Sequence, residues 1–137
     1  MSTLYPHWRD ALPDWRWAPE FQPWELASTG RGDHAGLGNN SLLVVPNLMD
    51  RARAARVHCH RPWTILSAYR DPILNALVGG AALSQHKYFA LDIRIVGLDR
   101  WALYECLLAH GFTGFGFYNT FLHADFSKGR EWGKWKR

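Results

Sequence analysis

Long apolar runs, long polar tracts and a leader are missing from this sequence, and each absence excludes a class of protein. No apolar stretch is long enough to cross a bilayer, which excludes a helical membrane span. Hydrophobic residues make up 47% of the chain without a long polar tract, which excludes a disordered protein. The first ten residues contain neither a basic leader nor an apolar run, so we expect no conventional signal peptide.

Cysteine is also scarce. Cys59 and Cys106 are the two cysteines of the sequence, and two residues do not make a disulfide framework. Cys106 falls within the apolar pattern of a predicted helix, where a thiol behaves as a small hydrophobic side chain. We therefore expect Cys106 to fill the core.

The 137 residues are enough for one folded domain, which we expect to span residues 1–137. Residues 1–20 are predicted to form an irregular arm and residues 127–137 a basic tail. Most of the eight tryptophans are expected to pack in the core. The net charge of +4 favours an anionic partner, and both nucleic acid and a carboxylate-rich wall polymer fit that charge.

The pattern of apolar residues predicts short helices interspersed with short strands. Helices are expected at residues 21–27, 45–57, 72–78 and 99–109, with a glycine-rich loop at residues 28–40. Strands are expected at residues 63–68, 91–96, 115–118 and 121–126, and the last two are expected to form a hairpin. This order indicates an α+β fold in which a small antiparallel sheet packs with helices.

Strand alternation places polar side chains on one face of two of these strands. Leu91 and Ile93 are expected to face the core, which puts Asp92 on the opposite face. His123 and Asp125 share the polar face of their own strand in the same way. Burying such groups together is costly without a cation. Together with His86, the pair Asp92 and His123 offers two imidazoles and a carboxylate, a set that holds zinc and leaves its fourth position for water.

A second histidine cluster competes with this one. His58, Cys59 and His60 are consecutive, and alternating histidines on an extended segment can also hold a metal. The cluster follows a basic helix and has no carboxylate nearby, so we expect a solvated connection there.

Several short motifs then follow one another along the chain at compatible spacing. They are residues 21–26 (FQPWEL), 65–72 (ILSAYRDP), Asn75, 78–81 (VGGA), 84–86 (SQH), 90–93 (ALDI) and 121–125 (FLHAD). Together they resemble the zinc D-alanyl-D-alanine carboxypeptidase family, from about residue 20 to residue 126. That family includes bacterial wall peptidases and phage endolysins, and it shares its fold with the Hedgehog signalling domain.

The resemblance implies a role for each matching residue. His86, Asp92 and His123 would be the zinc ligands. Arg70 would bind a carboxylate or carbonyl of the peptide substrate, and Ser84 would help to position it. The family's general base is a carboxylate near the last histidine.

The base is not at its usual place in this sequence. Several branches of the family have an acid three residues before the last histidine, where this chain has Thr120. Asp125 is therefore the candidate for the catalytic base. The alternative role for Asp125 is to orient His123.

The histidine-to-aspartate spacing also departs from the family pattern, S-x-H-x-x-G-x-A-x-D. Five residues separate His86 from Asp92 instead of six, and Phe89 stands where a glycine is common. The turn after His86 must absorb the missing residue if Asp92 is to keep its strand register.

The leading hypothesis is a zinc peptidase that hydrolyses a peptide bond in peptidoglycan stem peptides. We expect a monomer that is made in the cytoplasm and acts at the cell wall, either phage-encoded or associated with a virion. The alternatives are a non-catalytic wall-binding or ligand-binding module on the same fold, and nucleic-acid binding through the basic surface. The latter has no recognisable motif, so no nucleic acid is expected.

Overall fold

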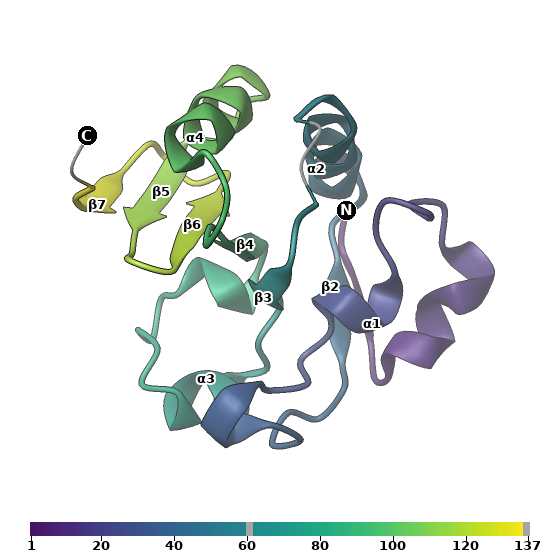
Figure 1. Ribbon diagram of the computed structural model, residues 1–137. Helices are drawn as coiled ribbons and strands as arrows, with labels where there is room; N and C mark the ends of the chain where they lie inside the picture. Colours follow the sequence, from purple (N-terminus) through teal and green to yellow (C-terminus); the bar gives the residue numbers. More distant parts are fainter. Residues whose placement is uncertain (60–61, 136–137) are drawn as a thin grey trace.

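The computed structural model describes residues 1–59 and 62–135 and has the expected α+β architecture (Figure 1). Its elements in chain order are β1 (Thr3–Tyr5), η1 (Trp8–Asp14), α1 (Pro23–Leu26), η2 (Gly32–His34), β2 (Leu42–Val44), α2 (Pro46–His58), β3 (Ile65–Ser67), α3 (Pro72–Leu77), η3 (Gln85–Lys87), β4 (Ala90–Arg94), α4 (Arg100–Ala109), β5 (Gly114–Phe117), β6 (Phe121–Asp125) and β7 (Glu131–Gly133). None of the described helices is both long and apolar enough to span a bilayer.

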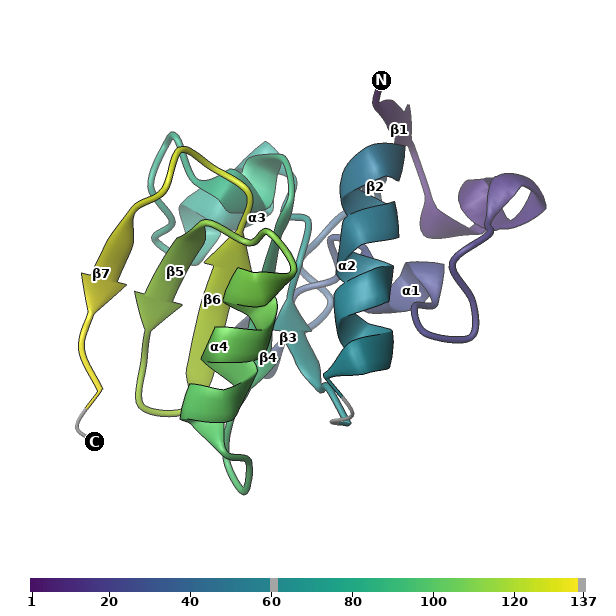
Figure 2. The ribbon, with the colours of Figure 1, turned by 90° about the horizontal axis from the view of Figure 1, so that it is seen from above.

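The main sheet has five strands in the order β3-β4-β6-β5-β7, and β1 pairs with β2 in a separate ribbon. Every pairing in the main sheet is antiparallel except that of β5 with β7, which is parallel. Helix α4 lies above the main sheet with α2 beside it, beyond the β3 edge, whereas α3 and η2 lie on the opposite side (Figures 1 and 2). The sheet therefore has one face under α4 and one face toward α3.

The apolar side of β4 and β6 forms the centre of the core, as predicted. Leu91 and Ile93 of β4 are fully buried, and so are Leu122 and Ala124 of β6. Phe115 of β5 joins them. Since alternate residues of a strand point to opposite faces, this packing turns the polar residues of β4 and β6 toward α3.

The two ends of the chain are more ordered than their composition indicated. Within the predicted arm, residues 3–5 form β1 and residues 8–14 form η1. Within the predicted basic tail, residues 131–133 form β7, and Trp135 is buried and donates from Nε1 to Tyr118 O at 2.8 Å. Both ends thus add strands that the apolar pattern did not indicate.

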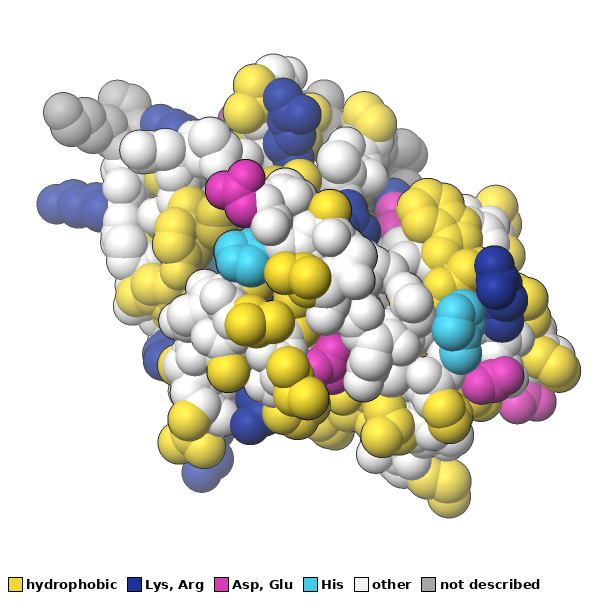
Figure 3. All heavy atoms as spheres, turned by 90° about the horizontal axis from the view of Figure 1, so that it is seen from below, with side chains coloured by type: hydrophobic (Ala, Val, Ile, Leu, Met, Phe, Trp, Pro, Cys, Tyr) yellow, Lys and Arg dark blue, Asp and Glu magenta, His cyan; other side chains and the backbone are white. Residues whose placement is uncertain are grey.

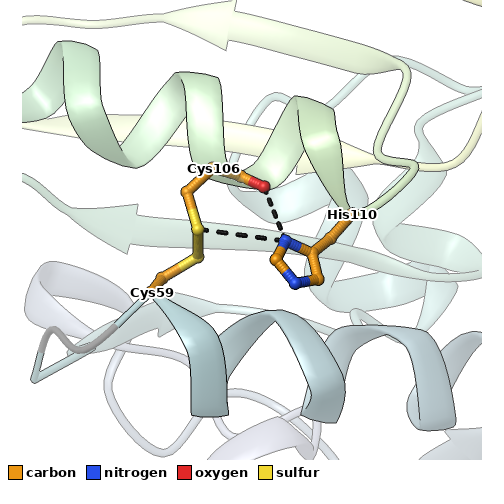
Figure 4. A group of neighbouring side chains, drawn as sticks. All are labelled: Cys59, Cys106 and His110. Atoms are coloured by element: carbon orange, nitrogen blue, oxygen red, sulfur yellow. Dashed lines mark hydrogen bonds between the residues drawn. A yellow bond between two sulfur atoms is a disulfide. The ribbon is translucent and has the colours of Figure 1, made fainter.

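The expectation for the cysteines was wrong. Cys59 follows the last residue of α2, and Cys106 lies in the middle of α4. The two are joined by a disulfide, with their Cα atoms 6.0 Å apart (Figure 4). The two cysteines are 47 positions apart in the sequence. Pairing depends on how α2 lies beside α4, a tertiary contact that the spacing of two cysteines does not reveal.

Candidate metal centre

The candidate metal centre lies on the face of the sheet that points away from α4. Asp92 of β4 and His123 of β6 are direct partners in the antiparallel register, so their side chains emerge next to each other. His86 comes from η3, which precedes β4. Its backbone N–H donates to Ser84 Oγ at 3.2 Å, and its carbonyl accepts from Arg70 N at 2.7 Å.

Three ligand-type atoms meet at this point with equal separations. His86 Nε2, His123 Nδ1 and Asp92 Oδ1 lie 3.1 Å from one another in all three pairs. A tetrahedral zinc with ligand distances of about 2.0–2.1 Å separates its ligand atoms by roughly 3.3–3.4 Å. The three residues are only 2%, 9% and 6% exposed for His86, Asp92 and His123. The donor set therefore fits one zinc-sized cation with little adjustment.

The opposite edges of both imidazoles are held by hydrogen bonds. His86 Nδ1 lies 2.6 Å from Ala68 O, and His123 Nε2 lies 2.6 Å from Asp125 Oδ2. A carbonyl and a carboxylate only accept, so these two nitrogens carry the protons. When the rings are neutral, the nitrogens that face Asp92 carry a lone pair and no proton. Three acceptors in van der Waals contact repel one another unless a proton or a metal ion lies between them.

Asp125 lies behind His123 rather than in front of it. Its side chain is fully buried, and its second oxygen, Oδ1, accepts from Ser127 N at 2.9 Å. A Cβ at Gly114 would come within 1.9 Å of the same oxygen, so the absence of a side chain on β5 makes room for the carboxylate. This position favours the orienting role over the role of general base.

The carboxylate of Asp92 and the imidazole of His123 shift each other's pKa toward the charged forms. Burial alone would raise the pKa of Asp92, but the charge of His86 and hydrogen bonds from His123 and His86 outweigh it and lower that pKa. Burial alone would lower the pKa of His123, yet the hydrogen bonds to Asp125 and Asp92 raise it. The surroundings of the three groups thus favour a positive charge between them.

A cavity of about 570 Å³ opens from the candidate metal centre. Arg70 and Ser84, the two residues expected to bind substrate, both line it. Within the described part of the chain, the buried Nε of Arg70 has no hydrogen-bond partner. Burial lowers the pKa of Arg70, and the nearby carboxylate of Asp92 opposes that effect. A guanidinium that lines the cavity suits an acceptor group of a ligand, whereas the enclosed Nε itself is not open to the cavity.

The cavity wall beyond His123 was not predicted from the sequence. Trp132 of β7 lies across Gly116 of β5, whose Cβ would come within 2.6 Å of the indole. Gly116 is also the register partner of His123, so the indole reaches the imidazole, with ring centroids 4.8 Å apart. Trp132 Nε1 donates to Tyr118 Oη at 2.8 Å, and Arg130 stacks over the indole with its Cζ 4.5 Å from the centroid.

The sequence signal for this wall was present but ambiguous. A glycine at alternate positions of β5 and a tryptophan shortly after β6 are compatible with close packing, but a three-residue parallel strand has no pattern of its own. Arg31 also lines the cavity. Its guanidinium is already engaged, because it donates to Ile65 O and, at 3.2 Å, to Glu25 O.

The face of the molecule around α3 carries apolar surface. Figure 3 views the molecule from below Figure 1, the side on which α3 and η2 lie, and apolar side chains gather near the middle of that face. Leu74 and Val78 of the α3 region line the cavity, whereas Ile73 and Leu77 point outward and are exposed. The α3 region therefore supplies apolar side chains both to the cavity wall and to the surface.

The rival histidine segment does not contribute to this centre. His58 is the last residue of α2, Cys59 belongs to the disulfide, and His60 lies outside the described residues. Neither His58 nor Cys59 lines the cavity.

A family model described as Peptidase M15 matches residues 19–125. The match covers most of the chain and includes all three residues of the candidate metal centre. A comparison with curated proteins finds no match. On the strength of the family model, the chain belongs to the M15 peptidases, a family that is in general zinc-dependent.

Proposed function

We propose that this M15 peptidase is a zinc-dependent hydrolase that cleaves a peptide bond in the stem peptides of peptidoglycan. The observation that carries the proposal is the buried triangle of His86, Asp92 and His123, whose ligand atoms are mutually 3.1 Å apart. Bound zinc would lower the pKa of a water molecule and polarise a substrate carbonyl. Three protein ligands would leave a fourth coordination position for water, and all three residues line the cavity.

Arg70 is the residue that we assign to the substrate. A planar guanidinium binds a carboxylate through two parallel hydrogen bonds, and Arg70 lines the cavity. Ser84 is assigned a supporting role, because its Oγ lines the cavity and also accepts from His86 N. Asp125 acts through His123 as a positioning residue.

The charge of the cavity suits stem peptides, which carry free carboxylates. Arg31, Arg70 and Arg130 line the cavity, and among its described lining residues Asp92 is the sole carboxylate. A ligand with a net negative charge is therefore favoured over a cationic one. We place the site of action at the bacterial wall, in the manner of a compact lysin.

A non-catalytic binding module is the second candidate. The observation that favours it is the lack of a second carboxylate among the described lining residues, because a carboxylate commonly serves as the general base. Such a module would hold wall peptides in the same cavity without cutting them.

The test combines metal content with product analysis. Purified protein should hold about one zinc per chain, lower the turbidity of a peptidoglycan suspension and release peptides that mass spectrometry identifies. His123→Ala should lose zinc and activity together, whereas His34→Ala, in the loop region outside the triangle, should lose neither. Stoichiometric zinc with bound but uncut wall peptides would identify the binding module. A metal-free protein that neither cuts nor binds wall peptides would refute both.

A further inference from the structure

A second group of metal-ligand side chains lies on the helical side of the molecule. Cys59, Cys106 and His110 each offer a ligand atom, and these atoms lie within 4.8 Å of one another (Figure 4). None of the three lines the cavity of the candidate metal centre. The group joins the end of α2 to the last turn of α4 and plays no part in the proposed hydrolysis.

The helices themselves bring the group together. Cys106 and His110 are four residues apart, so they lie on the same face of α4 one turn from each other. His110 Nδ1 is 2.8 Å from Cys106 O and 3.9 Å from Cys106 Sγ. His58, at the end of α2, stacks on His110 with ring centroids 5.1 Å apart. Each helix thus presents one cysteine and one histidine to the same place.

We propose that this group becomes a second metal site when the disulfide is reduced. A dithiol or phosphine reductant supplies two electrons, the S–S bond breaks, and two protons complete the thiols of Cys59 and Cys106. A zinc-type cation then displaces those protons and binds two thiolates. His110 is the third ligand and His58 the fourth, which completes the two-cysteine, two-histidine set typical of structural zinc.

The movements required of the two cysteines are small. Two Zn–S bonds of about 2.3 Å place the sulfurs roughly 3.8 Å apart, which side-chain rotation achieves between Cα atoms 6.0 Å apart. His110 gives up its contact with Cys106 O and carries its proton on the other ring nitrogen. The Nδ1 of His58 is held 2.8 Å from Ala54 O, which leaves its other nitrogen for a ligand.

The consequence is a link between α2 and α4 in both redox states. Under oxidising conditions the disulfide is the link, and under reducing conditions the metal is. The candidate hydrolytic centre lies on the other side of the sheet, so this proposal does not depend on the proposed function.

Cobalt titration tests the proposal, since Co²⁺ replaces Zn²⁺ and gives an intense charge-transfer absorption only when thiolates bind it. The His123→Ala variant is used so that the hydrolytic centre does not compete. Treatment with a phosphine reductant should produce the thiolate-to-cobalt band, saturating at one Co²⁺ per chain. The oxidised form of the same variant should give no such band. Near-ultraviolet circular dichroism should report a folded protein in both forms.

Variants of the second site give the matched controls. Cys106→Ser should abolish the band in the reduced protein, and His110→Ala should weaken cobalt binding at least about tenfold. His7→Ala, a histidine distant from the group in sequence and placed in the N-terminal segment, should leave the titration unchanged. A reduced, folded protein without the band would overturn the proposal. So would loss of the folded signal on reduction, or cobalt binding that is equally tight in His110→Ala.

Discussion

Replacing Asp125 by asparagine separates the two roles that this residue can have. In the native protein both carboxylate oxygens accept a hydrogen bond, Oδ2 from His123 Nε2 at 2.6 Å and Oδ1 from Ser127 N at 2.9 Å. An asparagine has one acceptor oxygen and one NH₂ donor. In Asp125→Asn, the side-chain NH₂ must therefore point at either His123 Nε2–H or Ser127 N–H. Two donors then face each other at a fully buried position.

The size of the effect follows from these contacts. A buried donor without an acceptor costs about 1–3 kcal/mol, so the free energy of unfolding should fall by that amount. Loss of the carboxylate behind a ligating histidine typically weakens metal binding about 10–100-fold. Burial alone would raise the pKa of Asp125, but hydrogen bonds from His123 and Ser127 lower it, so the native group is ionised at neutral pH and the charge is lost in the variant.

The assay measures zinc affinity and turnover on wall peptides as a function of free zinc. If Asp125 orients His123, Asp125→Asn should need more zinc but recover most of its kcat at saturation. If Asp125 is the general base, kcat should stay low at any zinc concentration. Glu105→Gln, an exposed carboxylate change on α4, is the matched control and should alter neither quantity. Native zinc affinity in Asp125→Asn would refute the orienting role.

Three further predictions concern the cavity and its frame. Arg70→Lys should keep its zinc and its fold but lose most of its turnover on carboxylate-bearing peptides, since an ammonium cannot form two parallel hydrogen bonds. Normal cleavage with a lower melting temperature would mean that Arg70 is structural. Gly116→Ala should push the Trp132 indole off the sheet, because the added Cβ would lie 2.6 Å from it. We expect the free energy of unfolding to fall by about 1–3 kcal/mol and KM to rise. An indole that keeps its position in a crystal or NMR structure of the variant would contradict this. Asp71 is the N-cap of α3, and its Oδ1 accepts from Leu74 N at 2.9 Å. Asp71→Ala removes this bond and should lower the free energy of unfolding by about 2 kcal/mol at pH 7. Burial alone would raise the pKa of Asp71, but its hydrogen bonds lower that pKa in the folded protein. The stabilisation that ionised Asp71 provides is therefore present above its ordinary pKa of 3.8. It is lost as the pH falls through the lower pKa of the folded state. Denaturant unfolding of the native and Asp71→Ala proteins should therefore converge in acid.

The antiparallel part of the fold could be predicted because it is local. The hairpin of β5 and β6 joins adjacent segments, and the alternation of apolar and polar residues in β4 and β6 identifies which side each residue faces. From that alternation, Asp92 and His123 were expected on one face, and they are direct partners across the sheet.

The features that the sequence did not predict depend on contacts between distant segments. β7 has three residues and pairs in parallel with β5 across the intervening hairpin, so no alternation of its own identifies it. The disulfide requires α2 to end beside the middle of α4. Trp132 became part of the cavity only because Gly116 leaves space beneath it. Each of these contacts is set by packing and not by local propensity.

The shortened spacing between His86 and Asp92 shows how local geometry protects the site. A slip of one residue in β4 would turn Asp92 into the core and bring a leucine or isoleucine to His123, because side chains alternate with a period of two. The structure avoids the slip by ending η3 at Lys87 and entering β4 at Ala90, with Tyr88 at φ −130° and ψ −90° between them. Phe89, in the place of the common glycine, is buried and packs on Phe126 with ring centroids 5.6 Å apart. An aromatic anchor just before β4 fixes the register from one side, and the pairing with β6 fixes it from the other. The missing residue is thus taken from the turn, and the carboxylate keeps its position opposite the histidine.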